Sequence, residues 1–339
     1  MKTISLDRGF SNPYPSLHSG SVMTQDTIDS GMAFLVGELE KQDPKLREPL
    51  TSVTWPRDIP VRTGGGFVDS VATYNVDYAT SGGNNDGVQG GAANNIPVMQ
   101  ADIDKDSFRV FIWSHVMKLP FVDQEKMAQI GRSLPDILDK GIHLAHDKKL
   151  DVNAYTGLSE FGTTGLVNTT TIKTTTAAPH TASGTDTQWV HKTAVEIMKD
   201  INDAITATWQ DSEFDVTGMG NHILIPPEQY AYIKNTPVST AGERSIYTYL
   251  MENNIAKDQG VTLSIQPCRW CKGVGTGSTD RMVVYCNNED RVRFEMTSPL
   301  ARVTTQASVT EAAYMTLFMS QFSQVEWLYT CFARYVDGI

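Results

Sequence analysis

Residues 51–104 constrain the fold of this chain most, because they read as two long β-strands joined by a glycine- and asparagine-rich tip. The tip, residues 81–95, holds five glycines and four asparagines, which favour turns over packed structure. The return arm covers residues 96–113. A hairpin of this length is marginally stable alone in water. We therefore expect it to lie on another domain or on another copy of the chain. The β-forming residues of the outgoing arm alternate with polar ones at a period near two: Val68, Val71, Tyr74, Val76 and Tyr78.

Length and charge limit the classes of protein to consider. A chain of 339 residues with a 40% apolar fraction predicts about two domains, each with a true core. Its formal net charge is −11, from 39 acidic and 28 basic residues. Affinity for DNA comes largely from lysine and arginine on phosphates, so this balance does not suit a dedicated nucleic-acid binder. Such a chain can still enclose nucleic acid without binding it tightly.

Cysteine usage and hydropathy predict a reducing compartment and no membrane. Four cysteines in a chain of this length do not make a disulfide framework. The N-terminal residues contain no apolar stretch of the kind found in secretory signals. No run approaches 18 apolar residues, so we expect no membrane span.

The first half of the chain predicts an arm and a long helix around the hairpin. Residues 1–30 read as an extended arm, and residues 31–50 contain a short amphipathic helix. A helix is expected over 116–131. Ser133 then caps a second helix, with Asp136 three residues on, that runs to about residue 155. Its inward positions are expected to be Leu134, Leu138, Ile142 and Ala145.

The second half predicts a further long helix and then, from about residue 215, a compact α/β unit, so the fold class is α+β. Residues 156–184 read as loop with hints of strand at 166–167 and 170–174, and Thr185–Gln188 reads as a capping box. That box would start a helix with these inward residues: Ala194, Ile197, Met198, Ile201 and Ile205. Strands are expected at 223–225, 261–265, 281–286, 291–296, 316–322 and 324–335, with helical pieces at 228–233 and 243–253.

One cysteine pair is the sharpest candidate for redox or metal chemistry. Cys268 and Cys271 have CxxC spacing, but structural zinc usually needs two such pairs. The other cysteines, Cys286 and Cys331, form no second pair. We interpret Cys268 and Cys271 as free thiols in a surface loop, and a redox or metal module built on them stays open as an alternative function.

A histidine group is the other candidate. His143, His146 and Asp147 fall on one side of the expected long helix, and we interpret them as a solvated polar face rather than as metal ligands. The sequence contains no GxSxG elbow and no HExxH motif. We expect no enzyme, and no catalytic, cofactor-binding or metal site.

Short phrases spread over nearly the whole chain resemble one known family. Each phrase is weak alone, but their order is specific: Leu39–Pro44, Ile59–Val61, Asn95–Pro97, Gly165–Asn168, Leu224–Tyr230 and Tyr335–Ile339. In this order they resemble the major capsid proteins of tailed bacteriophages. These have the Hong Kong 97 fold, which encapsulin nanocompartments share. The nearest branch was once catalogued as a phage and prophage domain of unknown function.

The resemblance implies a structural role and a division of the chain. It implies a major capsid protein that self-assembles, as pentamers and hexamers, into the icosahedral shell around the double-stranded DNA of a tailed phage. The shell would be assembled in the host cytoplasm and would be part of the virion. The implied parts are an N-terminal arm (1–50), an extended loop (51–113), a peripheral domain with a spine helix (114–215 and 300–339) and an axial domain (216–299).

The resemblance also bears on partners. It implies a separate scaffold protein or none, leaves portal and cement proteins open as partners, and implies that DNA is enclosed without sequence-specific binding. Some members join subunits by lysine–asparagine isopeptide bonds through a lysine in the extended loop. No lysine lies between Val61 and Asp104, so we do not expect that linkage. An encapsulin-like compartment and a minor vertex or tail protein remain as alternatives.

Overall fold

The computed structural model of the chain describes residues 52–81, 96–129, 133–182, 184–239, 242 and 244–339. It also describes two short strands, β1 (Ile4–Ser5) and β2 (Val22–Met23), which pair with each other. Residues 1–51 form one unit and residues 52–339 a second. The expected helix in residues 31–50, most of the expected arm and the hairpin tip from residue 82 lie outside the described residues.

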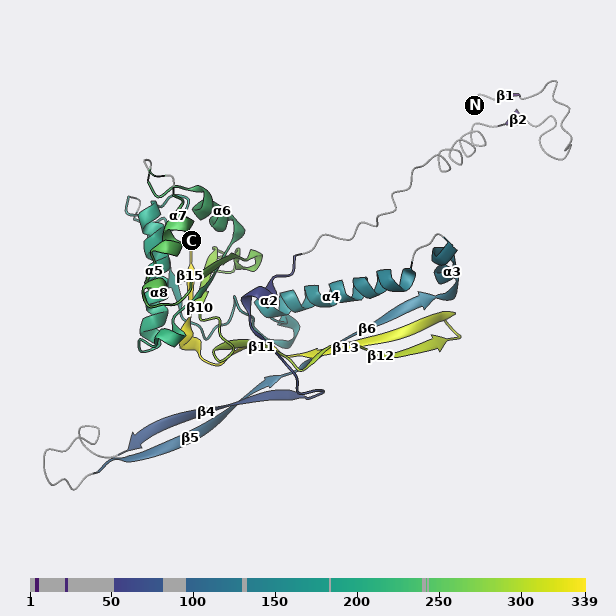
Figure 1. The fold of residues 1–339 in the computed structure, drawn as a ribbon, viewed down its shortest axis with the longest axis horizontal. Helices are drawn as coiled ribbons and strands as arrows, with labels where there is room; N and C mark the ends of the chain where they lie inside the picture. Colours follow the sequence, from purple (N-terminus) through teal and green to yellow (C-terminus); the bar gives the residue numbers. More distant parts are fainter. Residues whose placement is uncertain are drawn as a thin grey trace. The chain divides into compact units, whose positions relative to one another are not determined.

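A five-stranded sheet forms the α/β core of the second unit (Figure 1). Its strand order is β7 (Thr174–Thr176), β15 (Ala333–Asp337), β10 (Arg281–Tyr285), β8 (His222–Ile225), β9 (Ser264–Pro267). The residues of β8 and β10 are buried, and alternate residues enter two different hydrophobic clusters. Both faces of this sheet are therefore covered.

Helices pack on one side of this sheet. The α5 helix (Ala194–Asp211) inserts Ile197, Ile201 and Ile205 into the same cluster as Ile223 and Val284. Around it lie α6 (Pro227–Asn235), α7 (Ile246–Glu252) and α8 (Ile255–Asp258). The helices and strands after residue 215 agree with the expected α/β unit, and Ile197, Ile201 and Ile205 of the preceding helix are inward, as expected.

A three-stranded antiparallel sheet carries the long helix. Its order is β12 (Ser298–Ser308), β13 (Ala313–Phe322), β6 (Phe111–Pro120). The α4 helix (Leu134–Thr156) packs on it through Ile142, which contacts Met117 and Phe318. The Ser133 side chain accepts a hydrogen bond from the Asp136 amide, which confirms the predicted start of the helix.

Smaller elements link the two sheets. The α2 turn (Trp55–Asp58) and β3 (Val61–Thr63) precede the hairpin, and β3 runs parallel to β11 (Val292–Met296). On its other side β11 pairs with β14 (Val325–Trp327). Trp55, Phe294 and Phe322 pack in the same cluster as Tyr285 of the five-stranded sheet, so one core connects these parts.

The predicted hairpin is present as an isolated two-stranded ribbon. The strands β4 (Ser70–Ser81) and β5 (Val98–Arg109) pair in antiparallel register from Ser70↔Arg109 to Ser81↔Val98. Because β5 extends to Arg109, Lys105 is part of the hairpin, opposite Tyr74. A lysine is thus present on this loop, and the reason for excluding an isopeptide linkage no longer holds.

Several predicted boundaries were wrong because tertiary pairing decided them. The helix expected over 116–131 begins only with α3 (Phe121–Gln129), since residues 111–120 pair with β13 along their whole length. The predicted capping box at Thr185 does not start α5. Its N-cap is Thr193, which forms a reciprocal capping box with Glu196.

Some expected strand limits and inward positions also differ from the structure. The strand hint at 166–167 is a turn, and the long strand expected over 324–335 is interrupted by a 3-10 turn at Thr330–Phe332. Ala145 is exposed rather than inward. The C-terminal strand β15, expected in the peripheral part, pairs with β10 of the expected axial part, and β7 and α5 join the same sheet core.

Candidate assembly surfaces

Two buried carboxylates anchor the segment from which the hairpin departs. The Asp151 side chain, on α4, accepts hydrogen bonds from the backbone amides of Thr54 and Trp55 at 3.0 and 3.3 Å. It also accepts from Arg269 Nη2 at 2.7 Å and Trp270 Nε1 at 2.9 Å. One carboxylate therefore joins the start of α2 to the long helix and to the loop after β9.

Asp58 performs the same role at the end of α2. Its side chain is fully buried and is bound by Arg57, by the Tyr155 hydroxyl and, at 3.2 Å, by His222 Nε2. The Tyr285 hydroxyl donates to the Asp58 carbonyl. Burial alone would raise the pKa of this carboxyl, but the hydrogen bonds from His222, Arg57 and Tyr155 outweigh it and hold the pKa below its usual value.

The register of the hairpin gives its two faces opposite character. Residues directly opposite each other across an antiparallel pair project to the same face. The pairs Tyr74↔Lys105, Val76↔Ile103, Tyr78↔Ala101 and Thr80↔Met99 therefore define one face. Its large apolar side chains are between 47% and 73% exposed: Tyr74, Val76, Tyr78, Met99 and Ile103. We call this set the tyrosine face.

The opposite face of the hairpin is acidic. Asp77 stands directly across from Asp102, and Asn75 across from Asp104. Asp106 follows on the same face and accepts a hydrogen bond from the Asn75 amide at 2.7 Å. We call the four carboxylates of Asp77, Asp102, Asp104 and Asp106 the aspartate face. Like charges directly opposite destabilise a ribbon.

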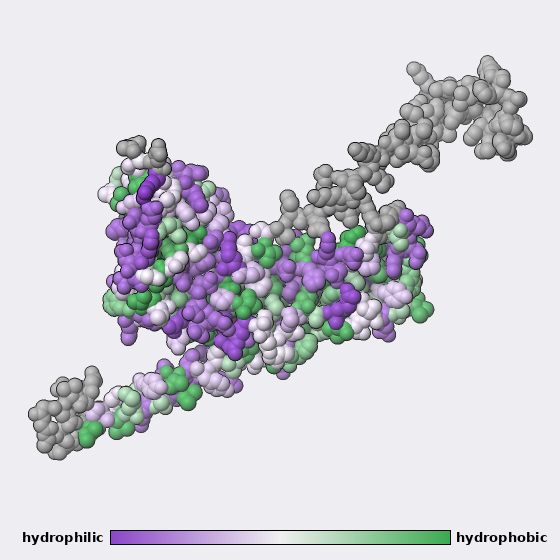
Figure 2. All heavy atoms as spheres, in the orientation of Figure 1, coloured by the Kyte–Doolittle hydropathy of each residue, from purple (hydrophilic) through white to green (hydrophobic). Residues whose placement is uncertain are grey.

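The three-stranded sheet also has apolar side chains on the face turned away from α4. Phe318 and Met117 face α4, so the alternate residues of β13 and β6 face the other way. Ile112 and Val116 are 60% and 54% exposed, and Val116 pairs with Leu317. The outward set is Ile112, Val116, Met315, Leu317 and Met319, which we call the methionine face. Figure 2 shows hydrophobic residues at the surface along both the hairpin and this region.

The cysteine pair is not on the surface, contrary to the sequence interpretation. Cys268 and Cys271 are unpaired and at most 1% exposed, in the cluster that contains Tyr155 and Tyr285. Burial, then the neighbouring Cys268, raises the pKa of the Cys271 thiol well above its usual value. A thiol is a nucleophile and a metal ligand only as thiolate, so this environment does not suit redox or metal chemistry.

The two histidines expected on one solvated face lie in different environments. His143 is exposed, but His146 is 4% exposed and its Nε2 lies 2.9 Å from Ser320 Oγ of β13. The Trp113 ring meets the His146 ring edge-on. Among the residues that the structure describes, no group of three or more His, Cys, Asp or Glu side chains is arranged to hold a metal ion.

The burial of His146 is expected to make the free energy of unfolding depend on pH. Burial, partly offset by Asp147, lowers its pKa, so the unfolded chain binds the proton more readily than the folded one. Stability is therefore lost as the pH falls through the ordinary histidine pKa of about 6.5 toward the lower folded value. We expect His146→Gln to reduce the loss of stability between pH 7.5 and 5.5, measured by urea unfolding of the unassembled subunit. An unchanged pH slope would contradict this expectation.

Comparison with known proteins shows which family the chain belongs to. The sequence profile described as "Major capsid protein" matches residues 85–339. The chain belongs to the major capsid protein family. This capsid protein is a shell-forming subunit of a phage, and its place is the virion. Membership of this family implies a structural role rather than an enzymatic one.

Solved structures share the fold of this capsid protein. The capsid of Myoviridae phage XM1 aligns with a TM-score of 0.74 at 16% identity, covering 89% of this chain and 98% of that one. Microbacterium phage Oxtober96 aligns at 0.56 and 13%, covering 90% and 98%. The capsid of a native GTA particle aligns at 0.56 and 9%, covering 88% and 94%. No curated protein sequence matches. These likenesses confirm the predicted α+β capsid fold.

The sequence reasoning missed the two buried carboxylates of the capsid protein. A signal was present in the sequence, because Asp58 directly precedes Ile59 and Asp151 lies between Leu150 and Val152. Neither carboxylate has a motif partner nearby, because its donors come from segments remote in sequence. In the described part of the chain, no helix is long and apolar enough to cross a membrane.

Proposed function

We propose that this capsid protein builds the icosahedral shell around the double-stranded DNA of a tailed phage, as pentamers and hexamers of itself. The observation that supports this most is the fold shared with the XM1 capsid over 98% of that chain. A self-assembling shell repeats many modest contacts with closed symmetry, so each contact can be weak while the whole is stable.

The parts of the fold suggest their roles. The five-stranded sheet with α5 to α8 is proposed as the axial domain, around which pentamers and hexamers close. The β12–β13–β6 sheet with α4 is proposed as the peripheral domain, with α4 as its spine. The hairpin of β4 and β5 is proposed as the extended loop that lies across an adjacent subunit, and residues 1–50 as an arm reaching along a neighbour.

Charge and partners complete the proposal. A formal net charge of −11 suits a container against which packed DNA slides, because strong phosphate contacts would hold it. Separate scaffold, portal and cement proteins are proposed to act with the subunit. Assembly is proposed to take place in the host cytoplasm.

Electron microscopy of the expressed protein, alone and with the scaffold proteins of its phage, tests the proposal. We expect closed shells, tubes or capsomer rings. Shells that hold only a protein cargo would favour an encapsulin-like compartment instead. Monomers under every condition, with the hairpin packed on its own core, would contradict the proposal.

A further inference from the structure

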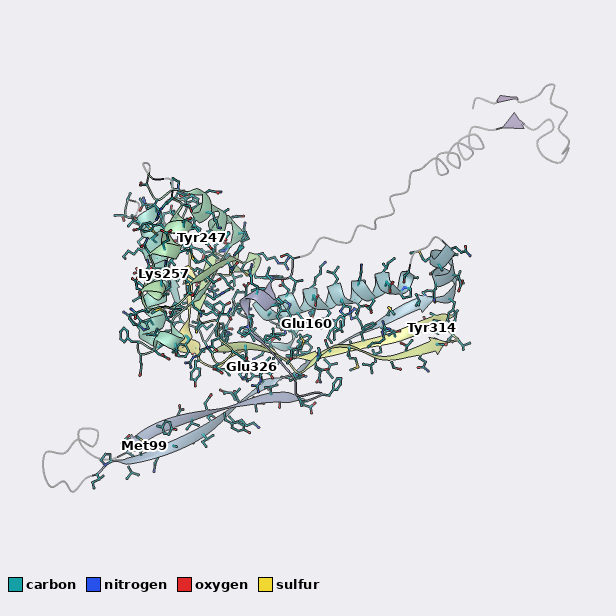
Figure 3. All side chains as sticks on the ribbon, in the orientation of Figure 1. Met99, Glu160, Tyr247, Lys257, Tyr314 and Glu326 are labelled. Atoms are coloured by element: carbon teal, nitrogen blue, oxygen red, sulfur yellow. The ribbon has the colours of Figure 1, made fainter. Side chains whose placement is uncertain are left out.

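A buried charged cluster lies on the strands that hold the root of the hairpin. In the register of β11 with β14 and β3, Arg293 stands opposite Glu326, and Glu295 stands opposite Arg62. Opposite residues share a face and so do alternate residues of one strand, so these four side chains lie on one face of the sheet. The other face of the same strands enters the hydrophobic core. Glu326 is labelled in Figure 3.

This small sheet is the last part of the core before the hairpin begins. On one side of β3, the Phe294 amide donates to the Pro60 carbonyl at 2.9 Å. On the other side, the Gly64 amide donates to the Met296 carbonyl at 3.1 Å. The hairpin strand β4 begins shortly afterwards, at Ser70. The strength of the pairing between β3 and β11 therefore decides how firmly the outgoing arm of the hairpin is attached.

The cluster buries two carboxylates but only one guanidinium. Glu326 and Glu295 are 0% and 6% exposed, and Arg293 is 8% exposed. The side chain of Arg62 is 53% exposed, and its Nε lies 3.9 Å from Glu295 Oε1. Burying an unpaired charge is costly, and a buried ionisable group tends to become neutral instead. The charge balance of the cluster therefore favours the uptake of one proton.

Two oxygen atoms show where this proton fits. Arg293 Nε donates to Glu326 Oε2 at 2.9 Å and lies 3.5 Å from Glu295 Oε2, so both carboxylates are neighbours of one nitrogen. Among the described residues, Glu326 Oε1 and Glu295 Oε2 are buried and have no hydrogen-bond partner. A protonated carboxyl donates a hydrogen bond, and an ionised one only accepts. A proton on Glu326 Oε1, donated to Glu295 Oε2, would give both atoms a partner.

A metal ion suits this position less well than a proton. Arg293 contacts both carboxylates, so its positive charge would repel a cation placed between them. In the part of the chain that the structure describes, no three His, Cys, Asp or Glu side chains are arranged to hold a metal ion.

The charged neighbours of the pair act in both directions. Burial is the largest influence, and it raises the pKa of Glu295 and of Glu326. Arg293 and Arg62 lower both pKa values in part. The charge of Glu295 raises the pKa of Glu326 again, and Glu289 does the same to Glu295. The balance keeps both carboxyls above their ordinary pKa.

We propose that Glu326 and Glu295 share one proton in the folded subunit, and that this proton tightens the attachment of β3, and so of the hairpin root, to β11 and β14. When the proton leaves, two buried negative charges remain close together on adjacent strands, which favours opening of the sheet. Stability from a carboxyl whose pKa is raised by folding is fully present below the ordinary glutamate pKa of about 4.3. It is lost as the pH rises through the folded pKa. The shared proton belongs to the single subunit, so it is independent of shell assembly.

Infrared spectroscopy of the unassembled subunit tests the shared proton. The carbonyl stretch of a protonated carboxyl is separate from the carboxylate bands. Between about pH 5 and 9, we expect the parent to lose one such carbonyl band as the pH rises, and both Glu326→Gln and Glu295→Gln to lack this step. Glu311→Gln, at an exposed partner of Lys118, is the matched control and should keep the step. A parent without the step, or a step that survives in either variant of the pair, would overturn the shared proton.

Hydrogen exchange reads the attachment of the hairpin root directly. After correction for the intrinsic effect of pH, protection of the Phe294 and Gly64 amides should fall at least about threefold more between about pH 6 and 8 in the parent than in Glu326→Gln. The amides of α5 are the internal control and should change equally in both proteins. If Glu326→Gln does not fold, Glu295→Gln takes its place. Equal behaviour of Phe294 and Gly64 in parent and variant would overturn the coupling to β3, whether or not shells form.

Discussion

Replacing Asp58 by alanine is expected to lower the free energy of unfolding of the unassembled subunit by about 3–5 kcal/mol. The side chain is fully buried, and its removal leaves His222, Tyr155 and Arg57 without their acceptor. Unsatisfied buried donors account for most of the loss. Urea unfolding followed by circular dichroism measures it.

The control for Asp58 is an exposed carboxylate with comparable partners. Asp139 on α4 lies 3.2 Å from Arg302 and 3.7 Å from His143, with a 35% exposed side chain. Asp139→Ala should cost less than about 1 kcal/mol, as exposed ion pairs do. Similar losses from both variants would contradict the assigned role of Asp58. Because its folded pKa is depressed, the stabilisation by Asp58 should be present above about pH 4 and be lost as the pH falls further.

Replacing Gly165 by alanine should destabilise the subunit by about 3 kcal/mol, the upper end of the usual cost of overpacking. A Cβ on Gly165 would lie 2.4 Å from the carbonyl carbon and oxygen of Tyr155 and 2.6 Å from the Thr156 nitrogen. These are backbone atoms at the end of α4, which cannot move aside without disturbing the helix. Thermal unfolding of the unassembled subunit would show the loss.

Gly141 provides the matched control for Gly165. It lies within α4, is exposed, and has no atom beyond its own helix backbone and chain neighbours within 4 Å of the Cβ position. Gly141→Ala should leave stability unchanged or raise it by about 0.5–1 kcal/mol, because alanine favours the helix. If Gly165→Ala behaved like Gly141→Ala, the close approach at Gly165 would be wrong.

The phrase Gly165–Asn168, one of those that resemble the family, has a structural role in this chain. The amides of Leu166 and Val167 donate to the Ala154 and Tyr155 carbonyls at 2.9 and 3.0 Å. The Asn168 side chain accepts from the Gly165 amide and donates to the Thr156 carbonyl. The phrase Gly165–Asn168 therefore completes the C-terminus of the spine helix, a role that local sequence alone did not reveal.

Two helix starts illustrate the limit of local signals. Ser133 and Asp136 lie next to a strong helical pattern, and the helix begins there. Thr185 begins an equally good capping pattern, but Asp186 instead accepts a hydrogen bond from the Gln188 amide in a turn. The buried Trp189 donates a hydrogen bond to Asp200, and the α5 helix begins only after its N-cap, Thr193. The tertiary contact between Trp189 and Asp200 thus accompanies a helix start that lies after the local capping pattern at Thr185.

The sequence alone determined the hairpin, the spine helix, the buried strands around Leu224 and Val283, and the capsid family. The secondary-structure elements follow from periodicity and capping, which act over a few residues, and the family follows from the order of short phrases along the chain. Only the tertiary structure decided which residues are buried, as for Cys271 and His146, and which carboxylates anchor the hairpin root. It also decided the two faces of the ribbon, because strand register depends on pairing partners far apart in the chain.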